Sequence, residues 1–375
     1  MKDLRKQEAE STPVSVIILN YNGLTNLGPD LLSRCLSSVL HTDYPKFQVI
    51  FFDNGSKDGS VEFVKKVFGR NSSLRVVASP RNYGFALGNN YALDYADGEY
   101  IALLNNDVEV ETNWLRELAR VLDDDSKVGV AQSKILCLDR LHIQTMGDLF
   151  DPSLSVYLVG ENEEDNGQYD RNCEITFACG AALITRKSVV EKIGLFDPDY
   201  FWYHDDSDLS WRARLAGYKV LAVPRSIVYH KGMGTSNRTF KRKEETFYYL
   251  TSRVGLFVKN FGLKSMLRFG KVLLTSVAMD SLGLLLQGEG KTLVKFVAWI
   301  PKNFKSNWKN RLIVQRQIRK VEDAEIVKSF LDNSIFVLRI RRQFDILSGS
   351  QQHANFNRAL HQITRDYYFN HLYKS

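Results

Sequence analysis

The chain has 375 residues, 44% of them hydrophobic, so it is long enough for two domains and apolar enough to bury a large core. Its four cysteines form neither a CxxC pair nor a zinc-finger spacing, which favours reduced thiols in a cytosolic protein over a disulfide or zinc framework. Residues 1–239 carry 26 Lys and Arg against 33 Asp and Glu, whereas residues 240–375 carry 24 against 10, so an acidic front adjoins a basic rear. The polar tail 1–12 does not have the pattern of a signal peptide, and no uninterrupted apolar run reaches about 18 residues, so no certain transmembrane helix is expected.

Apolar runs of strand length alternate with stretches of helical spacing in the first part of the chain. Strands are expected at 14–19, 47–52, 74–78 and 100–104, and helices at 31–40, 61–68 and 84–97. This alternation predicts a mostly parallel sheet with helices on both faces.

Polar residues follow three of these strands, in the clusters Asn20 and Asn22, Asp53 and Asn54, and Asn105, Asn106 and Asp107. One such cluster is ordinary turn chemistry, because Asn and Asp cap helices and form turns. Three clusters at the carboxyl edge of one parallel sheet favour a polar binding site, since ligands of such sheets bind there.

The middle of the chain is less regular. Residues 125–175 are expected to be irregular, and residues 175–185 to form a strand whose small residues permit close backbone approach or tight packing. A helix is expected from about Ser207, followed by two short strands at 220–223 and 227–229.

Three carboxylates fall within four residues at the start of that helix, at Asp205, Asp206 and Asp208, behind an aromatic run. Carboxylates this close repel one another unless a cation compensates or one of them binds a proton more tightly. Either outcome suits a reaction that needs a metal or a general base, and a solvated acidic loop is the alternative.

Helical signals replace strand signals after residue 239. Residues 268–287 have helical spacing, and lysines then interleave with Phe and Trp over residues 291–309. This mixture suits an interfacial segment at an anionic membrane surface, and a helical lid with a solvated lysine face is the alternative. No nucleic-acid partner is expected, because no recognised nucleic-acid motif accompanies the basic residues.

Neither a GxxxxGK[ST] loop nor a GxGxxG loop follows the first strand. A bound diphosphate would therefore need a divalent cation more than a cradle of glycine amides. Asp107, at the tip of a buried strand, could supply a hard oxygen ligand for Mg²⁺ or Mn²⁺.

Five motifs occur in a fixed order: VSVIILNYN at 14–22, DNGS at 53–56, RNYGFA at 81–86, NND at 105–107 and DDSDL at 205–209. Over about residues 13–240 the chain resembles the family 2 inverting glycosyltransferases of the GT-A fold. It is most similar to the subgroup that transfers rhamnose and related sugars to lipid-linked or polysaccharide acceptors. The resemblance implies a Rossmann-like GT-A catalytic domain with a mostly parallel sheet at 13–239. Composition and spacing add a polar tail at 1–12 and a basic, mainly helical region at 240–375, for which membrane association and a helical lid are the two alternatives.

The resemblance also assigns donor-site residues. Tyr21 would touch the nucleobase and Asn106 the ribose, and the full donor set is Tyr21, Asn22, Asp53, Asn54, Asn82, Gly84, Asn105 and Asn106. Asp107 would bind the metal on the donor diphosphate, although this motif has one carboxylate where many relatives have two. His230 would help to bind that metal, because it begins a family histidine pattern that continues here through Gly234, Thr235 and Ser236.

The acidic cluster would carry the chemistry. Asp206 aligns with the family's catalytic base, and Asp205, in place of the more usual Glu, is the rival for that role. Asp208 is expected to cap the following helix. Trp202 and Tyr203 would stack on the acceptor sugar, and core packing is the alternative for both.

These expectations describe a metal-dependent inverting glycosyltransferase of hexosyl or rhamnosyl type, using a UDP-, GDP- or dTDP-sugar donor. The acceptor would be a glycan or lipid-linked saccharide, met at the cytoplasmic face of the cell membrane. The alternatives are a sugar-phosphate nucleotidyltransferase, for which the N-terminal glycine-rich loop is missing, and a non-catalytic sugar-nucleotide-binding protein.

Overall fold

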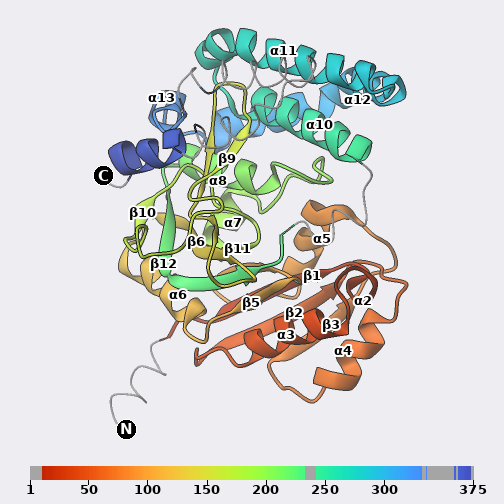
Figure 1. The fold of residues 1–375 in the computed structure, drawn as a ribbon, viewed down its shortest axis with the longest axis vertical. Helices are drawn as coiled ribbons and strands as arrows, with labels where there is room; N and C mark the ends of the chain where they lie inside the picture. Colours follow the sequence, from red (N-terminus) through yellow and green to blue (C-terminus); the bar gives the residue numbers. More distant parts are fainter. Residues whose placement is uncertain (1–10, 233–241, 332–334, 336–358, 360–361, 373–375) are drawn as a thin grey trace.

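The computed structural model describes residues 11–232, 242–331, 335, 359 and 362–372. The first four strands of its central sheet are parallel (Figure 1). β1 lies between β2 and β4, and β3 pairs with the outer edge of β2. Their bounds are β1 (Val14–Asn20), β2 (Phe47–Asp53), β3 (Leu74–Ala78) and β4 (Tyr100–Asn105). All four match the expected strands. They could be recognised because a parallel strand that is covered on both faces has a nearly continuous apolar sequence.

Helices cover both faces of this half, as the alternating pattern predicted. Ile17 belongs to the same buried cluster as Ala86 of α5, whereas the next residue along the strand, Ile18, belongs to a second cluster with Leu32 of α3. The helices are α3 (Pro29–Leu40), α4 (Ser60–Phe68) and α5 (Gly84–Leu93), preceded by the short α2 (Gly23–Leu27).

The second half of the sheet is mixed and completes the GT-A architecture. β11 runs antiparallel between β4 and β6, and β12 pairs in parallel with β6, in the overall order β10-β12-β6-β11-β4-β1-β2-β3. The strands of this half are β5 (Val108–Val110), β6 (Val128–Cys137), β7 (Ile143–Thr145), β10 (Cys173–Glu174), β11 (Ala182–Arg186) and β12 (Lys219–His230). A separate hairpin consists of β8 (Asp148–Phe150) and β9 (Val156–Leu158).

Two expectations about this half were wrong. Residues 125–175 are not irregular, because they contain an inner strand paired on both sides, β6, and four short strands. The two strands expected at 220–223 and 227–229 are one strand, β12, with a register shift between Val223 and Ile227. The shift leaves Pro224 in a bulge, where a residue without an N–H group does not break the ladder.

The remaining helices complete the sheet-containing part of the chain, residues 13–239, and form the C-terminal region after it. They are α6 (Trp114–Asp124), α7 (Lys187–Ile193), α8 (Asp205–Leu215), α10 (Arg242–Asn260), α11 (Leu263–Leu286), α12 (Gly290–Ile313), the π-helical turn η1 (Val314–Ile318), α13 (Asp323–Val327) and a second π-helical turn, η2 (Tyr368–Leu372). The predicted helical character of the region after residue 239 is therefore confirmed over the described residues.

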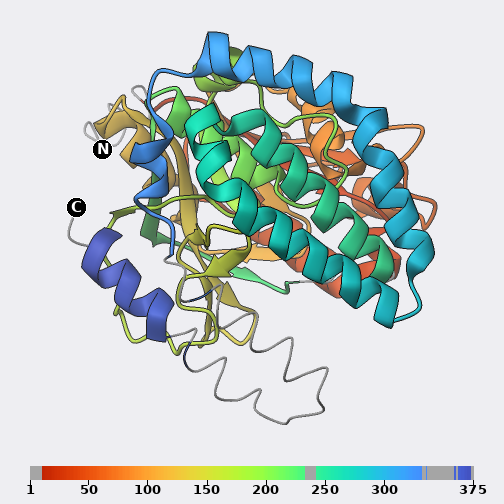
Figure 2. The same ribbon diagram turned by 90° about the horizontal axis from the view of Figure 1, so that it is seen from above.

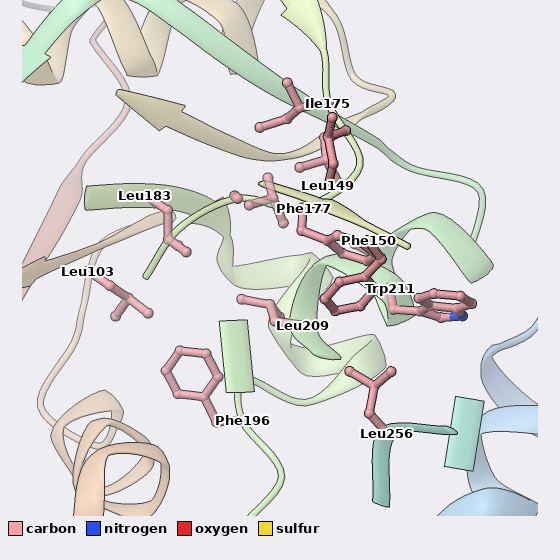
Figure 3. Close-up of a cluster of buried hydrophobic side chains, with 14 of the residues drawn as sticks. Leu103, Leu149, Phe150, Ile175, Phe177, Leu183, Phe196, Leu209, Trp211 and Leu256 are labelled. Carbon is pink, nitrogen blue, oxygen red and sulfur yellow. The ribbon is translucent and has the colours of Figure 1, made fainter. Parts of the chain in front are cut away.

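The C-terminal helices share a buried core with the sheet-containing part of the chain. Leu256 of α10 lies in the same buried cluster as Leu209 and Trp211 of α8 and as Phe150 and Phe177 from the sheet side (Figure 3). Trp211 also packs against Phe261, just after α10. Burial of large aromatic side chains across this boundary couples the stability of the two regions.

Candidate active site

Hydrogen bonds join the carboxyl ends of β1, β2 and β4 into one polar edge. Asn20 Nδ2 donates to Asp53 Oδ1 at 2.8 Å, and Asn106 Nδ2 donates to Asn20 Oδ1 at 2.7 Å. These three side chains are buried, and their pairing meets the requirement that buried polar groups find partners. The strand-end clusters predicted from the sequence are therefore brought together.

Asp53 and Asn54 hold the loops around this edge. Asp53 accepts hydrogen bonds from the Ser56 backbone N–H and hydroxyl, at 2.9 and 2.6 Å. Asn54 donates to Asn82 Oδ1 and to the Gly84 carbonyl, both at 3.0 Å. Both side chains are 2% exposed, so in this structure they position the loops of the edge.

Tyr21 and Asn22 form the turn after β1. Asn22 adopts a left-handed conformation at φ 49°, which Asn tolerates better than most residues. Its backbone N–H donates to Ser56 Oγ and its side-chain oxygen accepts from the Lys57 N–H. Tyr21 is half-buried beside this turn.

Gly84 brings the loop after β3 against the aromatic run. Its φ is +81°, and a Cβ atom would lie 2.7 Å from the Phe201 ring. The next N–H, of Phe85, donates to the Phe201 carbonyl at 3.1 Å. Only glycine meets both requirements, so the Arg81–Ala86 motif fixes the distance between the donor loops and the acidic segment.

Asp107 and His230 meet as predicted, at the junction of β4, β5 and β12. His230 Nε2 lies 3.0 Å from Asp107 Oδ1 and 3.4 Å from Asn105 Nδ2. Burial raises the pKa of Asp107, but the charge and hydrogen bond of His230 outweigh it and hold this pKa below its ordinary value. Asp107 is therefore an ionised carboxylate that faces an imidazole.

Gln144 completes this pair, and its role was not foreseen. Gln144 Oε1 lies 2.9 Å from His230 Nδ1, so the oxygen accepts a hydrogen bond from an Nδ1–H group. Nε2 is therefore the ring nitrogen that faces the Asp107 carboxylate, where either a proton on Nε2 or a metal cation can lie between the two groups. An outer hydrogen bond of this kind is usual for metal-binding histidines. The donor set thus fits a divalent cation. The Gly234, Thr235 and Ser236 of the same motif lie outside the described residues.

The two candidate bases differ in access and in hydrogen bonding. Asp206 is partly exposed, and its carboxylate accepts from the Gly180 N–H at 2.8 Å and the Ser207 N–H at 2.7 Å. Asp205 is 5% exposed, and its Oδ2 has no hydrogen-bond partner among the described residues. Burial raises the pKa of both carboxyl groups, that of Asp205 well above the usual range because the charge of Asp206 adds to the effect. The geometry favours Asp206 as the ionised group that a substrate can reach.

Asp208 does not cap α8, contrary to expectation. The helix begins at Asp205, four residues earlier than a cap at Asp208 requires, and the capping position is His204, at φ 60°. Asp208 is fully buried, where Lys259 Nζ lies 2.8 Å and Arg212 Nε 2.8 Å from its carboxylate. The third carboxylate of the cluster is thus neutralised by cations within and beyond its own helix.

A second residue whose role was not foreseen is Asp148, and its carboxyl group lies beside the base candidate Asp206. Ligand atoms of Asp148, Cys179 and Asp206 all lie within 4.8 Å of one another. Burial and the charge of Asp206 raise the pKa of Asp148 well above its usual range, which favours the protonated form of Asp148 beside a charged Asp206. Hard cations prefer ionised oxygen ligands, so the Asp107–His230 pair suits Mg²⁺ or Mn²⁺ better than this group does.

Gly180 and Ala181, just before β11, connect the candidate metal site with the candidate base. The Asn105 N–H donates to the Ala181 carbonyl at 3.0 Å, while the neighbouring Gly180 N–H donates to Asp206. A Cβ on Gly180 would lie 3.3 Å from Asp206 Cβ, so this position leaves little room for a side chain. One residue step of backbone therefore separates the two halves of the site.

Trp202 and Tyr203 lie between this site and α10. Their rings stack with centroids 4.2 Å apart, and Tyr203 meets Tyr249 of α10 edge to face. Ser252 of α10 donates a hydrogen bond to the Trp202 carbonyl at 3.0 Å. Both predicted acceptor residues are half-buried, so the C-terminal region forms one wall of the acidic segment.

Comparison with known proteins agrees with this architecture. Rhamnosyltransferase WbbL of Escherichia coli is 26% identical over 254 residues, covering 62% of this chain and 92% of its own length. Poly-beta-1,6-N-acetyl-D-glucosamine synthase of Staphylococcus epidermidis is 22% identical over 226 residues, covering 60% of this chain and 52% of its own length. The chain spans a smaller share of three other curated relatives, which it covers over only 25%, 33% and 10% of their own lengths.

Among solved structures, that of GalNAc-T7 with UDP, GalNAc and Mn²⁺ matches 72% of this chain and 57% of its own, with a TM-score of 0.52 and 17% sequence identity. This likeness supports the fold. Residues 15–194, which run from β1 through the Asn105–Asp107 edge to α7, match the family model described as Glycosyl transferase family 2. With the ordered motifs and the geometry of the sheet edge, this match places residues 15–194 of the chain in glycosyl transferase family 2.

Proposed function

We propose that this protein is a metal-dependent, inverting glycosyltransferase that moves a sugar from a nucleoside-diphosphate sugar to an acceptor hydroxyl. The observation that carries the proposal is the state of Asp206. Asp206 is the partly exposed carboxylate of its cluster, and it accepts hydrogen bonds from two backbone N–H groups. One of these belongs to Gly180, whose neighbour Ala181 is bonded to Asn105 at the polar edge.

Asp206 acts as the general base. An acceptor hydroxyl has a pKa far above neutrality, so its proton must leave as its oxygen forms a bond to the anomeric carbon. Asp206 takes this proton while the bond from the anomeric carbon to the diphosphate breaks, with the electron pair leaving on the nucleoside diphosphate. Attack from the face opposite the leaving group inverts the anomeric centre. The raised pKa of Asp206 suits a base that works near neutral pH.

Asp205 and Asp148 support this role without sharing it. Because both are buried beside Asp206, each favours its protonated form, and neither adds a second negative charge. Asp208 is removed from the balance by Lys259 and Arg212. The arrangement explains how Asp206 can stay ionised beside three other carboxyl groups.

Asp107 and His230 would hold a divalent cation, with Gln144 orienting the imidazole. When bound, the cation supplies positive charge to the diphosphate as it leaves. Asn106 and the Asn82–Gly84 loop line the donor side, with Asp53 and Asn54 behind them. GalNAc-T7, which shares the fold, is seen with UDP and Mn²⁺, which makes Mn²⁺ a suitable first ion to test.

The acceptor is a saccharide on a polysaccharide or lipid carrier, and the transferred sugar is a hexose or deoxyhexose such as rhamnose. The likeness to rhamnosyltransferase WbbL, which spans nearly all of that protein, supports this choice. Trp202 and Tyr203 offer stacked aromatic faces for a sugar ring beside Asp206.

The test begins with a panel of UDP-, GDP- and dTDP-sugars, each with Mn²⁺, scored by thermal stabilisation, since a ligand that binds the folded state raises the unfolding midpoint. Release of nucleoside diphosphate from the selected donor then compares Asp206→Asn with Asp205→Asn. We expect Asp206→Asn to retain donor stabilisation and lose activity by about 10²–10⁴-fold. Asp205→Asn should be much milder, because a neutral amide replaces a neutral carboxyl group. Wild-type turnover of Asp206→Asn would reject the assignment of the base.

A further inference from the structure

Exposed apolar side chains are concentrated on two helices of the C-terminal region. Twelve of the fifteen large hydrophobic residues exposed in the described part of the chain lie on α11 and α12. They are Leu263, Leu267, Leu274, Leu282, Leu285, Leu286, Val294, Val297, Ile300, Phe304, Trp308 and Ile313. Patches of this extent mark interaction surfaces in soluble proteins.

On α12 these side chains form a stripe with a lysine stripe beside it. Val294, Val297, Phe304 and Trp308 recur at helical spacing on the exposed side, while Phe296, on the opposite side, is buried. A second row, about a quarter to a third of a turn away, carries Lys291, Lys295, Lys302, Lys305 and Lys309, all exposed. Apolar and aromatic residues flanked by lysines are the composition of helices that lie in a membrane interface.

The same combination continues onto α11. Its exposed side carries Lys264, Arg268 and Lys271 toward its beginning and Leu282, Leu285 and Leu286 toward its end. Residues 263–313 hold nine Lys and Arg against two Asp and Glu. α11 is long and apolar enough to cross a membrane by length and composition, with 22% of its most apolar stretch buried in the protein.

We propose that the exposed face of α11 and α12 docks on the surface of an anionic bilayer, with the helices lying in the plane of the interface. Charge complementarity selects this occupant, because the lysine row faces lipid phosphates while the apolar stripe enters the acyl boundary. A second copy of the chain would bring equally basic surfaces together, which costs free energy. Insertion of α11 across the bilayer would bury Lys264, Arg268 and Lys271 or drag them to one side.

Docking in this plane would serve the proposed acceptor. α11 and α12 lie at the end of the molecule far from β1–β3 (Figure 1), and they pack beside α10 (Figure 2). α10 in turn contacts Trp202 and Tyr203, next to Asp206. A lipid-linked saccharide anchored in the same bilayer would therefore need to extend past one helix layer to reach the base. This use of the surface rests on the proposed function, whereas the docking itself does not.

The test is flotation of the intact protein with vesicles of phosphatidylcholine alone or mixed with phosphatidylglycerol, at low and high salt. The variant Lys295→Glu/Lys302→Glu/Lys309→Glu reverses the charged row, and Val297→Ser/Phe304→Ser/Trp308→Ser removes the apolar stripe. Lys65→Glu/Lys66→Glu/Arg70→Glu is the matched control, since it makes the same charge change on exposed positions in and just after α4. Nucleoside diphosphate release in detergent-free solution monitors the active site of each variant.

We expect flotation with the mixed vesicles only, weakened by salt and reduced by about tenfold or more in both α12 variants but not in the control. Asp206→Asn should float like the wild type, so loss of catalysis and loss of docking are separable. Equal binding to neutral vesicles, an equal loss in the control, or absence of flotation would overturn the proposal. So would resistance to carbonate extraction, which indicates a spanning helix, or a stable dimer that the apolar-stripe variant dissociates.

Discussion

The buried cation Lys259 belongs to α10 of the C-terminal region, but it should be essential to the stability of the sheet-containing part, residues 13–239. Its ammonium group lies 2.6 Å from Asp197 Oδ2 and 2.8 Å from Asp208 Oδ1, and it is 2% exposed. The replacement Lys259→Ala removes the shared cation and leaves two buried carboxylates. Removing one partner of a buried ion pair costs about 3–5 kcal/mol, because the remaining charge stays desolvated.

The partners that remain set the expected value within this range. Asp208 keeps Arg212 at 2.8 Å and Asn260 at 2.6 Å. Asp197 keeps the amide of Asn310 at 3.1 Å, and no second cation lies within ion-pair distance of it among the residues that the structure describes. Because Asp208 stays paired while Asp197 does not, we expect a loss near the lower limit, about 3 kcal/mol.

Urea unfolding of the full chain, followed by circular dichroism, measures this loss. Lys264→Ala is the control, since Lys264 is exposed on α11, and its effect should stay within about 0.5 kcal/mol. A loss below about 1 kcal/mol in Lys259→Ala would refute the argument, because it would mean that the buried carboxylates do not depend on this cation.

The acid side of the stability profile gives a second readout. Burial raises the pKa of Asp208, but Lys259 and Arg212 outweigh it and hold the pKa below its ordinary value. A carboxylate with a lowered folded-state pKa contributes stability above its unfolded pKa, about 3.9, and loses that contribution as pH falls through the folded value. Without Lys259 the folded pKa rises toward the unfolded one, so the acid-dependent loss should be smaller in Lys259→Ala.

Three further predictions concern the site. Gly180→Ala places a Cβ 3.3 Å from Asp206 Cβ, so we expect about a tenfold or greater fall in kcat at nearly unchanged donor stabilisation, measured by nucleoside diphosphate release. Gly84→Ala, at φ +81° and against Phe201, should lower the free energy of unfolding by about 1–3 kcal/mol in urea, and a neutral result would contradict the proposed contact. Burial raises the pKa of Asp206, so turnover should fall as pH drops through a value above the ordinary Asp range, with Gly180→Ala shifting that midpoint.

Much of the first half of the sheet could be predicted because its signals are local. β1, β2 and β4 are short apolar runs closed by Asn or Asp, and β3 is a short run that ends before Ser79 and Pro80. The order of these strands in the chain is nearly their order in space. β6 was missed because a buried inner strand next to charged loops has no distinctive period, and its partners, β11 and β12, lie about 50 and 90 residues further along the chain.

The candidate site shows the same division. Asp107, His230 and Asp206 were identified from motifs, and the structure brings Asp107 and His230 together. Gln144, Asp148 and Gly180 were not assigned roles, since their importance comes only from contacts made by folding. Asp208 was assigned to a cap because its cation, Lys259, is about 50 residues away in the sequence.

The ion pair between Lys259 and Asp208 limits how this protein could be recombined with its relatives. A chimera joined after β12 would pair one parent's α8 with the other parent's α10, and it would keep the buried charge balance only where both parents have matching residues at these two positions. Residues that share one buried network are not interchangeable one at a time, because their substitution effects are not additive. The unit that can be exchanged is therefore the GT-A sheet together with α10, and the natural point for joining a foreign C-terminal segment is Gly262, after that helix ends.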